Sequence, residues 1–151
     1  MTAVAATAPS LFGTGFTARR VDAARMRTVG GVLDALAQTW DFPAHFGRNR
    51  DALDDCMRDL PTGLHTPEGA PSTGWLTIIE NASQLLADEP DELKWFAESI
   101  DFWRDSYRNS HGDNSHGDAR FAVLLLDDAP AVVRDRWAEL GVRVTDPTEE
   151  I

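Results

Sequence analysis

The segment Phe121–Leu126 limits the possible folds of this chain more than any other, because it is apolar at every position. A strand without polar alternation has to be covered on both faces, as strands are in a parallel sheet packed between other elements. The run is also far shorter than the roughly 20 apolar residues that a membrane-spanning helix needs. The sequence therefore predicts a buried strand inside a globular domain.

Further strands and helices alternate along the chain. Strands are predicted at Phe16–Val21 and Trp75–Ile79. From Val29 to Trp40 apolar residues recur at helical spacing, with Thr28 as the N-cap and Pro43 as the stop. The remaining helices are predicted from about Asn49 to Leu60, from a cap at Asp88 through the apolar stripe Leu93–Tyr107, and from Pro130 to Gly141.

This order predicts an α/β fold with a small, mainly parallel three-stranded sheet covered by helices. Val142–Val144 is a candidate for a fourth, C-terminal strand, and the length of 151 residues fits one domain. We expect residues 1–15 to form a flexible N-terminal tail, residues 16–127 the domain, and residues 128–151 a helix–strand extension packed on the same domain. Segments 61–74 and 109–118 are predicted loops.

The charge balance narrows the kind of partner. Asp and Glu number 25 against 14 Lys and Arg, which gives a net charge of −11. Such a surface repels nucleic acid and anionic membranes and speeds the encounter with a basic protein, although many proteins are acidic for solubility alone. A lone cysteine, Cys56, excludes an internal disulfide, and the start MTAVAATAPS lacks a secretory signal, so we expect a cytoplasmic protein.

The predicted helix from Asn49 to Leu60 divides into two sides when its residues are placed at about 100° intervals. One side is apolar and is expected to enter the core: Ala52, Leu53, Cys56, Met57 and Leu60. The other side is charged and is expected to face solvent: Asp51, Asp54, Asp55, Arg58 and Asp59.

The charged side works against the stability of this helix. Aspartate is a poor helix former. Asp55 lies four residues from both Asp51 and Asp59, and like charges at that spacing cost about 0.2–0.5 kcal/mol per pair. Asp59 also lies near the negative end of the helix dipole, which costs about 0.3–1 kcal/mol. Because all of these features destabilise the helix, the pattern favours a functional surface over a merely solvated one.

The segment Phe42–Met57, FPAHFGRNRDALDDCM, resembles the signature of the barstar family: proline, an aromatic pair, glycine, Asn, and then Asp-Ala-Leu-x-Asp-Cys opening the second helix. A coarser similarity in element order covers about residues 16–127. The resemblance implies a barstar-like fold and an intracellular inhibitor of the ribonuclease barnase, without catalytic residues or cofactors. We expect an inhibitor of a small, basic, guanyl-type ribonuclease of the extracellular type, monomeric when free, which blocks the active site as a mimic of RNA phosphates.

The resemblance also implies which residues bind the partner. Asp55 corresponds to the acidic residue that enters the phosphate-binding site of the ribonuclease, and Asp51 to a second helical aspartate of the interface. His45 stands where the family has an aromatic ring that packs on the catalytic groove. The remaining expected binding residues are loop, capping and helix positions: Phe46, Gly47, Asn49 and Asp54.

Two departures from the family pattern leave a second function open. Asp54 replaces the interface tryptophan of the family, and Arg48 replaces the acidic residue after the glycine. Interface hot spots are usually aromatic residues or Arg, so the alternative is a barstar-fold interaction or immunity module whose target is not a ribonuclease. A further family carboxylate, from the third helix, corresponds to one of three residues: Glu89, Asp91 or Glu92.

Other clusters carry weaker signals. The loop residues His111, Asp113, His116 and Asp118 have no further ligand at metal-site spacing, and His45 has no accompanying nucleophile, so we expect neither a metal site nor an enzyme. Trp95 and Phe102 lie opposite the core stripe of their helix. We expect the 130–144 extension to cover them, with a second interface as the alternative.

Overall fold

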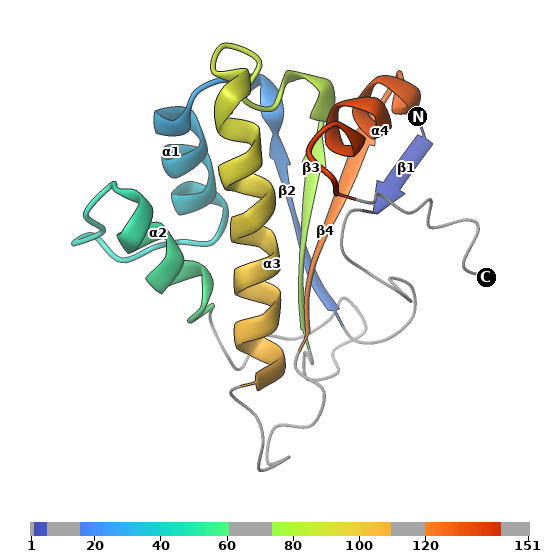
Figure 1. The fold of residues 1–151 in the computed structure, drawn as a ribbon. Coiled ribbons are helices and arrows are strands. Elements are labelled where there is room, and N and C mark those ends of the chain that lie inside the picture. Colours follow the sequence, from blue (N-terminus) through green and yellow to red (C-terminus); the bar gives the residue numbers. More distant parts are fainter. Residues whose placement is uncertain (1, 6–15, 61–73, 110–119, 143–151) are drawn as a thin grey trace.

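The computed structural model describes residues 2–5, 16–60, 74–109 and 120–142. A twisted sheet carries helices on one face, and α2 lies beside α3 on the side away from α4 (Figure 1). The strands are β1 (Thr2–Ala5), β2 (Phe16–Asp22), β3 (Gly74–Glu80) and β4 (Arg120–Asp127). The α-helices are α1 (Val29–Thr39), α2 (Arg50–Met57), α3 (Leu93–Asn109) and α4 (Pro130–Ala138). Short 3-10 turns lie at η1 (Ala23–Arg25), η2 (Ala82–Gln84) and η3 (Pro90–Glu92).

Strands β2, β3 and β4 form the predicted parallel sheet. Its order is β1-β4-β3-β2, with Phe16 opposite Gly74 and Gly74 opposite Arg120. Parallel strands cannot be joined by tight turns and need long crossover connections. The segment with α1 and α2 connects β2 to β3, and the segment with α3 connects β3 to β4. The predicted α/β class is therefore confirmed.

The fourth strand comes from the N-terminal end of the chain. β1 pairs antiparallel with β4, with Thr2 opposite Asp127 and Ala5 opposite Leu124. The prediction of a flexible tail over residues 1–15 is thus wrong for residues 2–5. Pairing with β1 satisfies the backbone groups along the outer edge of the apolar strand β4, which would otherwise be exposed. The C-terminal strand was predicted at residues 142–144. Val142 is not in a strand, and residues 143–144 lie outside the described residues.

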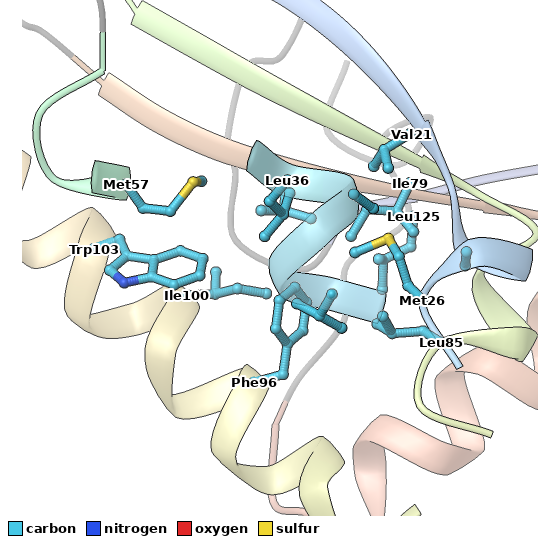
Figure 2. Close-up of a cluster of buried hydrophobic side chains, with 14 of the residues drawn as sticks. Val21, Met26, Leu36, Met57, Ile79, Leu85, Phe96, Ile100, Trp103 and Leu125 are labelled. Atoms are coloured by element: carbon cyan, nitrogen blue, oxygen red, sulfur yellow. The ribbon is translucent and has the colours of Figure 1, made fainter. Parts of the chain in front are cut away.

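Alternate side chains of β3 and β4 enter two separate apolar clusters. Trp75, Ile79, Phe121, Val123 and Leu125 belong to the main core, which lies between the sheet and the helices and includes Leu36, Phe96, Ile100 and Trp103 (Figure 2). Leu76, Ile78, Ala122 and Leu124 form a second buried cluster on the opposite face. Burial of both faces confirms what the unbroken apolar run predicts.

Helix boundaries follow local capping. The Thr28 hydroxyl accepts a hydrogen bond from the Gly31 N–H at 3.0 Å, as predicted for the start of α1. Pro130 opens α4, and Gly141 follows it with a φ of +77°, a conformation that glycine adopts without strain. None of the helices in the described ranges has the length and apolar character to cross a membrane.

The predicted cap at Asp88 is wrong. The Asp88 carboxylate lies outside α3 and forms a bidentate pair with the Arg27 guanidinium, at 2.8 and 3.2 Å. The neighbouring carboxylate of Glu89 accepts the Val29 N–H at 2.8 Å and so serves the start of α1. Pro90 opens the 3-10 turn η3 before α3, which leaves no place for a side-chain cap at residue 88.

Asp127 fastens the end of β4 to its neighbours. Its Oδ1 accepts the Ser83 N–H at 3.0 Å and its Oδ2 accepts the Ala129 N–H at 2.8 Å. Burial raises the pKa of this carboxyl, but the backbone donors at Ser83 and Ala129 lower it, and the pKa lies below the ordinary 3.8. A depressed pKa in the folded state means that the ionised carboxylate stabilises the fold above the unfolded-state pKa, and that this stabilisation is lost as pH falls through the folded-state pKa.

An Asp127→Asn variant is therefore expected to be less stable than the parent protein at neutral pH, because an amide offers only one acceptor oxygen for two donors. The difference in free energy of unfolding between the two proteins should narrow as the pH is lowered below about 4. Urea unfolding measured across this pH range checks the prediction. A difference that stays constant with pH would contradict the role assigned to the ionised carboxylate.

Candidate partner-binding site

Helix α2 begins where the sequence places its cap. The Asn49 Oδ1 accepts the Ala52 N–H at 2.8 Å, and Asn49 itself is in an extended conformation. The Asn49 amide nitrogen lies 3.4 Å from the Gly47 carbonyl oxygen, so the cap also ties the helix to the loop before it. Asp51, in the first turn, is placed where the helix dipole favours an anion.

The inner side of α2 is narrower than predicted. Leu53, Met57 and Leu60 are buried, whereas Ala52 and Cys56 are only half-buried. Partial burial raises the pKa of the Cys56 thiol, and the nearby carboxylates of Asp55 and Asp59 raise it further. A thiol with a raised pKa is a poor nucleophile at neutral pH, so Cys56 acts here as a small side chain at the margin of the core.

Three outward aspartates lie on α2 and just beyond its end, and we call them the acidic ridge: Asp51 and Asp55 in the helix, and Asp59 two residues after it. All three are exposed, and the four-residue spacing of Asp51 and Asp55 places these two one above the other on the helix. Among the described residues, none of their carboxylates has a hydrogen-bond or ion-pair partner. The ridge therefore presents three carboxylates that remain available to a cationic partner.

Asp54 does not belong to the outward side. Its Oδ1 accepts the Nε1–H of Trp103 in α3 at 2.7 Å, and its side chain is half-buried. The predicted placement of Asp54 on the solvent side is therefore wrong, because the residue faces α3. Arg58 is also turned to α3, where its Nε donates to the Ser106 hydroxyl at 2.8 Å and its guanidinium lies 4.9 Å from the Phe102 ring centre.

The loop before α2 is built around two rings. Phe42 and Phe46 meet edge to face with centres 5.0 Å apart, and both are half-buried against the core. The Phe46 N–H donates to the Pro43 carbonyl at 2.9 Å, which closes the loop. His45, between these anchors, is exposed. Of the predicted loop residues, His45 and Gly47 are thus accessible, whereas Phe46 supports the loop from within.

Arg48 is fixed to α1. Its Nε and Nη2 donate to the two carboxylate oxygens of Asp34, at 2.6 and 2.9 Å. Its backbone is left-handed, with a φ of +50°, a conformation that few residues other than glycine and Asn adopt. The bidentate pair holds the turn into α2 in place, so the positive charge of Arg48 is matched within the chain.

The candidate carboxylates near α3 differ in availability. Glu89 caps α1, as described above, and Glu92 pairs with Arg50 at 2.8 Å. Asp91 is exposed and has no hydrogen-bond or ion-pair partner in the described ranges. Asp91 is therefore the one of the three predicted candidates whose carboxylate remains uncommitted within these ranges.

The expectation that the 130–144 extension covers Trp95 and Phe102 is wrong. Helix α4 lies against β1, β4 and η2, on the other side of α3 from α2 (Figure 1). The cover comes instead from α2, whose Arg50 guanidinium lies 4.5 Å from the Trp95 ring centre, while Arg58 stacks on Phe102. Phe102 still keeps 46% of its surface exposed.

The described residues contain no group of three or more His, Cys, Asp or Glu side chains arranged to hold a metal ion. The four loop residues considered for such a site, at 111–118, lie outside the described ranges. What the described surface offers is a rigid helix with an acidic ridge, next to a loop with an exposed histidine.

A comparison with known protein families matches residues 16–130 to the family described as Barstar (barnase inhibitor). The chain belongs to the barstar family. A search of curated proteins found no match. Membership in the barstar family implies an inhibitor of the barnase-inhibitor type that acts through protein–protein contact, and not an enzyme. The match includes the loop, α2 and α3, and it ends at the first residue of α4.

Sequence reasoning missed two residues of α3 that support the candidate site from the core side. Trp103 and Tyr107 were expected only as apolar core residues, yet their polar atoms bind α2. The Tyr107 hydroxyl donates to the Met57 carbonyl at 2.7 Å and accepts the Leu60 N–H at 2.9 Å. Their residue types could have indicated these contacts, because the polar group of a buried Trp or Tyr usually forms a hydrogen bond.

Proposed function

We propose that the chain inhibits a small, basic ribonuclease of the guanyl type by inserting the Asp51 and Asp55 carboxylates into the phosphate-binding site of that enzyme. The observation that supports this most is the availability of the acidic ridge. The neighbouring arginines, Arg48, Arg50 and Arg58, are each engaged with groups of this chain, whereas the ridge carboxylates have no such partner within the part of the chain that the structure describes. An uncompensated row of anions on a rigid helix suits a site built to bind the phosphates of RNA.

The loop and Asp91 extend this surface in the proposal. His45 takes the position of the family's aromatic ring and contacts the catalytic groove of the ribonuclease. Asp91 supplies the carboxylate from the third helical region, since Glu89 and Glu92 are engaged elsewhere. The net charge of −11 speeds the approach of a basic enzyme. We further propose that the free protein is a monomer in the cytoplasm and that its target is a ribonuclease of the extracellular type.

The test is inhibition of RNA hydrolysis by a panel of purified, small, basic ribonucleases. We expect at least one enzyme to be inhibited at nanomolar concentration, and we expect the association rate constant to fall steeply with ionic strength. Absence of inhibition across the panel at micromolar concentration would contradict the proposal. Sedimentation of the free protein checks the monomeric state separately.

One observation favours a second candidate, a barstar-fold interaction or immunity module with a target that is not a nuclease. Asp54 stands at the position of the family's interface tryptophan, and the loop offers the exposed imidazole of His45 in place of a larger aromatic side chain. Aromatic residues and Arg dominate most interface hot spots. Affinity capture from the cells that make the protein separates the two: recovery of a non-nuclease protein, combined with no inhibition of the panel, supports the second candidate.

A further inference from the structure

We propose that Asp54 is a positioning residue, which fixes the rotation of α2 about its axis through its hydrogen bond to Trp103 and so directs the acidic ridge toward the partner. This inference rests on the proposed inhibitory function, because the ridge is the surface that meets the partner there. It assigns a role to the residue at which the chain departs from the tryptophan of its family.

Helix α2 carries two parallel rows of charged side chains. Arg50, Asp54 and the C-cap residue Arg58 form one row at four-residue spacing. Asp51 and Asp55 of the acidic ridge form the next row, displaced by one residue or about 100°, and Asp59 follows beyond the end of the helix. Every member of the first row contacts α3 or η3: Arg50 reaches Trp95 and Glu92, Asp54 reaches Trp103, and Arg58 reaches Phe102 and Ser106. The first row therefore docks the helix, and the second row is left to face outward.

The central contact is the most directional of the three. Trp103 is 1% exposed, and its ring meets Phe96 and Phe121 edge to face at 6.1 and 6.0 Å between centres. The indole N–H is consequently held in one direction by the packed core. Its 2.7 Å bond to Asp54 is a short, charge-assisted hydrogen bond, stronger than one between neutral groups.

The flanking contacts restrain the same rotation less sharply. The two arginines lie over aromatic faces, and both side chains are long and solvated. Leu53 and Met57 hold the inner side of the helix through apolar burial, which is not directional. If α2 rolled about its axis, these contacts would adjust, but the Asp54–Trp103 bond would break and leave a buried indole N–H unpaired.

The experiment compares Asp54→Asn with Asp54→Ala. Asparagine removes the charge and keeps an acceptor oxygen for Trp103, whereas alanine removes both. Asp59→Asn is the matched control, since it removes one exposed charge just after the same helix, from a carboxylate that has no hydrogen bond to α3 among the described residues. Binding to the inhibited ribonuclease is measured as separate association and dissociation rates, and the Trp103 indole N–H is followed by NMR in the free proteins.

A positioning role predicts that Asp54→Asn keeps most of the affinity, while Asp54→Ala dissociates about tenfold faster or more, with a similar association rate. Asp54→Ala should also shift the Trp103 indole resonance and speed the hydrogen exchange of α2 amides, and Asp59→Asn should do neither. If Asp54→Asn loses as much affinity as Asp54→Ala and leaves the indole resonance in place, Asp54 contacts the partner directly and the inference fails.

The two proposals fail in different ways. If no ribonuclease is inhibited by the unaltered protein, the proposed function is wrong, but the indole resonance and the amide exchange of the free variants still report whether Asp54 holds α2. If inhibition is found and the Asp54→Ala protein shows unaltered amide exchange and dissociation, the proposed function stands and the positioning role is wrong.

Discussion

Replacing Asp55 with alanine is expected to weaken binding to the inhibited ribonuclease by about 2–5 kcal/mol, which corresponds to roughly 30-fold or more in Kd. Asp55 is the middle member of the acidic ridge, lies exposed one turn from the loop, and has no ion-pair partner among the described residues. Its removal leaves cations of the enzyme buried without a counter-charge. Titration of RNA hydrolysis with the variant and the parent protein measures the loss.

Asp59→Ala is the control for this prediction. Asp59 carries the same charge in the acidic ridge, four residues further from the loop and past the end of α2. Its removal should slow association slightly without a large effect on dissociation. Thermal unfolding of the Asp55→Ala protein should be unchanged or slightly raised in Tm, because alanine favours the helix and relieves like-charge repulsion. Equal and small affinity losses at both positions would show that the acidic ridge is not the binding surface.

Tyr107→Phe is expected to lower the free energy of unfolding by about 2–6 kcal/mol. The Tyr107 hydroxyl satisfies the Leu60 N–H and the Met57 carbonyl, both at buried residues at the end of α2. Each buried polar group that loses its partner costs about 1–3 kcal/mol. Burial also raises the pKa of Tyr107 well above its ordinary value, so the hydroxyl stays protonated and available as a donor at any physiological pH.

Urea unfolding measures the effect of Tyr107→Phe, and Ser106→Ala serves as its control. Ser106 is the adjacent residue and also binds α2, but its hydrogen bond to Arg58 is exposed to solvent, so its loss should cost less than about 1 kcal/mol. If both variants lose the same small amount, water replaces the Tyr107 hydroxyl and the end of α2 is more open than the structure indicates.

Strong periodicity made most of the fold predictable. The unbroken run in β4 and the apolar stripe of α3 each carry enough residues to define period and burial, and Thr28 and Pro130 mark helix starts by their own chemistry. β1 has only four residues, which is too short for a periodic signal. β1 pairs with the edge of β4, which is more than a hundred residues away along the chain, so no local sequence pattern predicts this pairing.

The exposure of Asp51 and Asp55 was predictable from the helical pattern, but the placement of Asp54 on the solvent side was wrong. A helical wheel separates polar from apolar residues, so it placed Asp54 with the other aspartates. It does not show that α2 lies against a helix whose buried stripe includes an indole N–H donor. Asp88 failed for the same reason: a suitable cap residue was taken up by Arg27, 61 positions earlier in the chain. Polar side chains can bind partners that are distant in the sequence, and a local sequence pattern does not show which of these partners is nearby in the fold.

The internal pairing of Arg48 with Asp34 and of Asp54 with Trp103 has a consequence for transplanting the proposed recognition segment into a related scaffold. A graft limited to residues 42–57 would carry Arg48 and Asp54 but leave behind the residues that neutralise or bind them in α1 and α3. The residues that must be transferred together are therefore not contiguous: they are at least residues 42–57, Asp34 and Trp103. A recipient without an acceptor for Arg48 or a donor for Asp54 would receive two unmatched charges along with the new specificity.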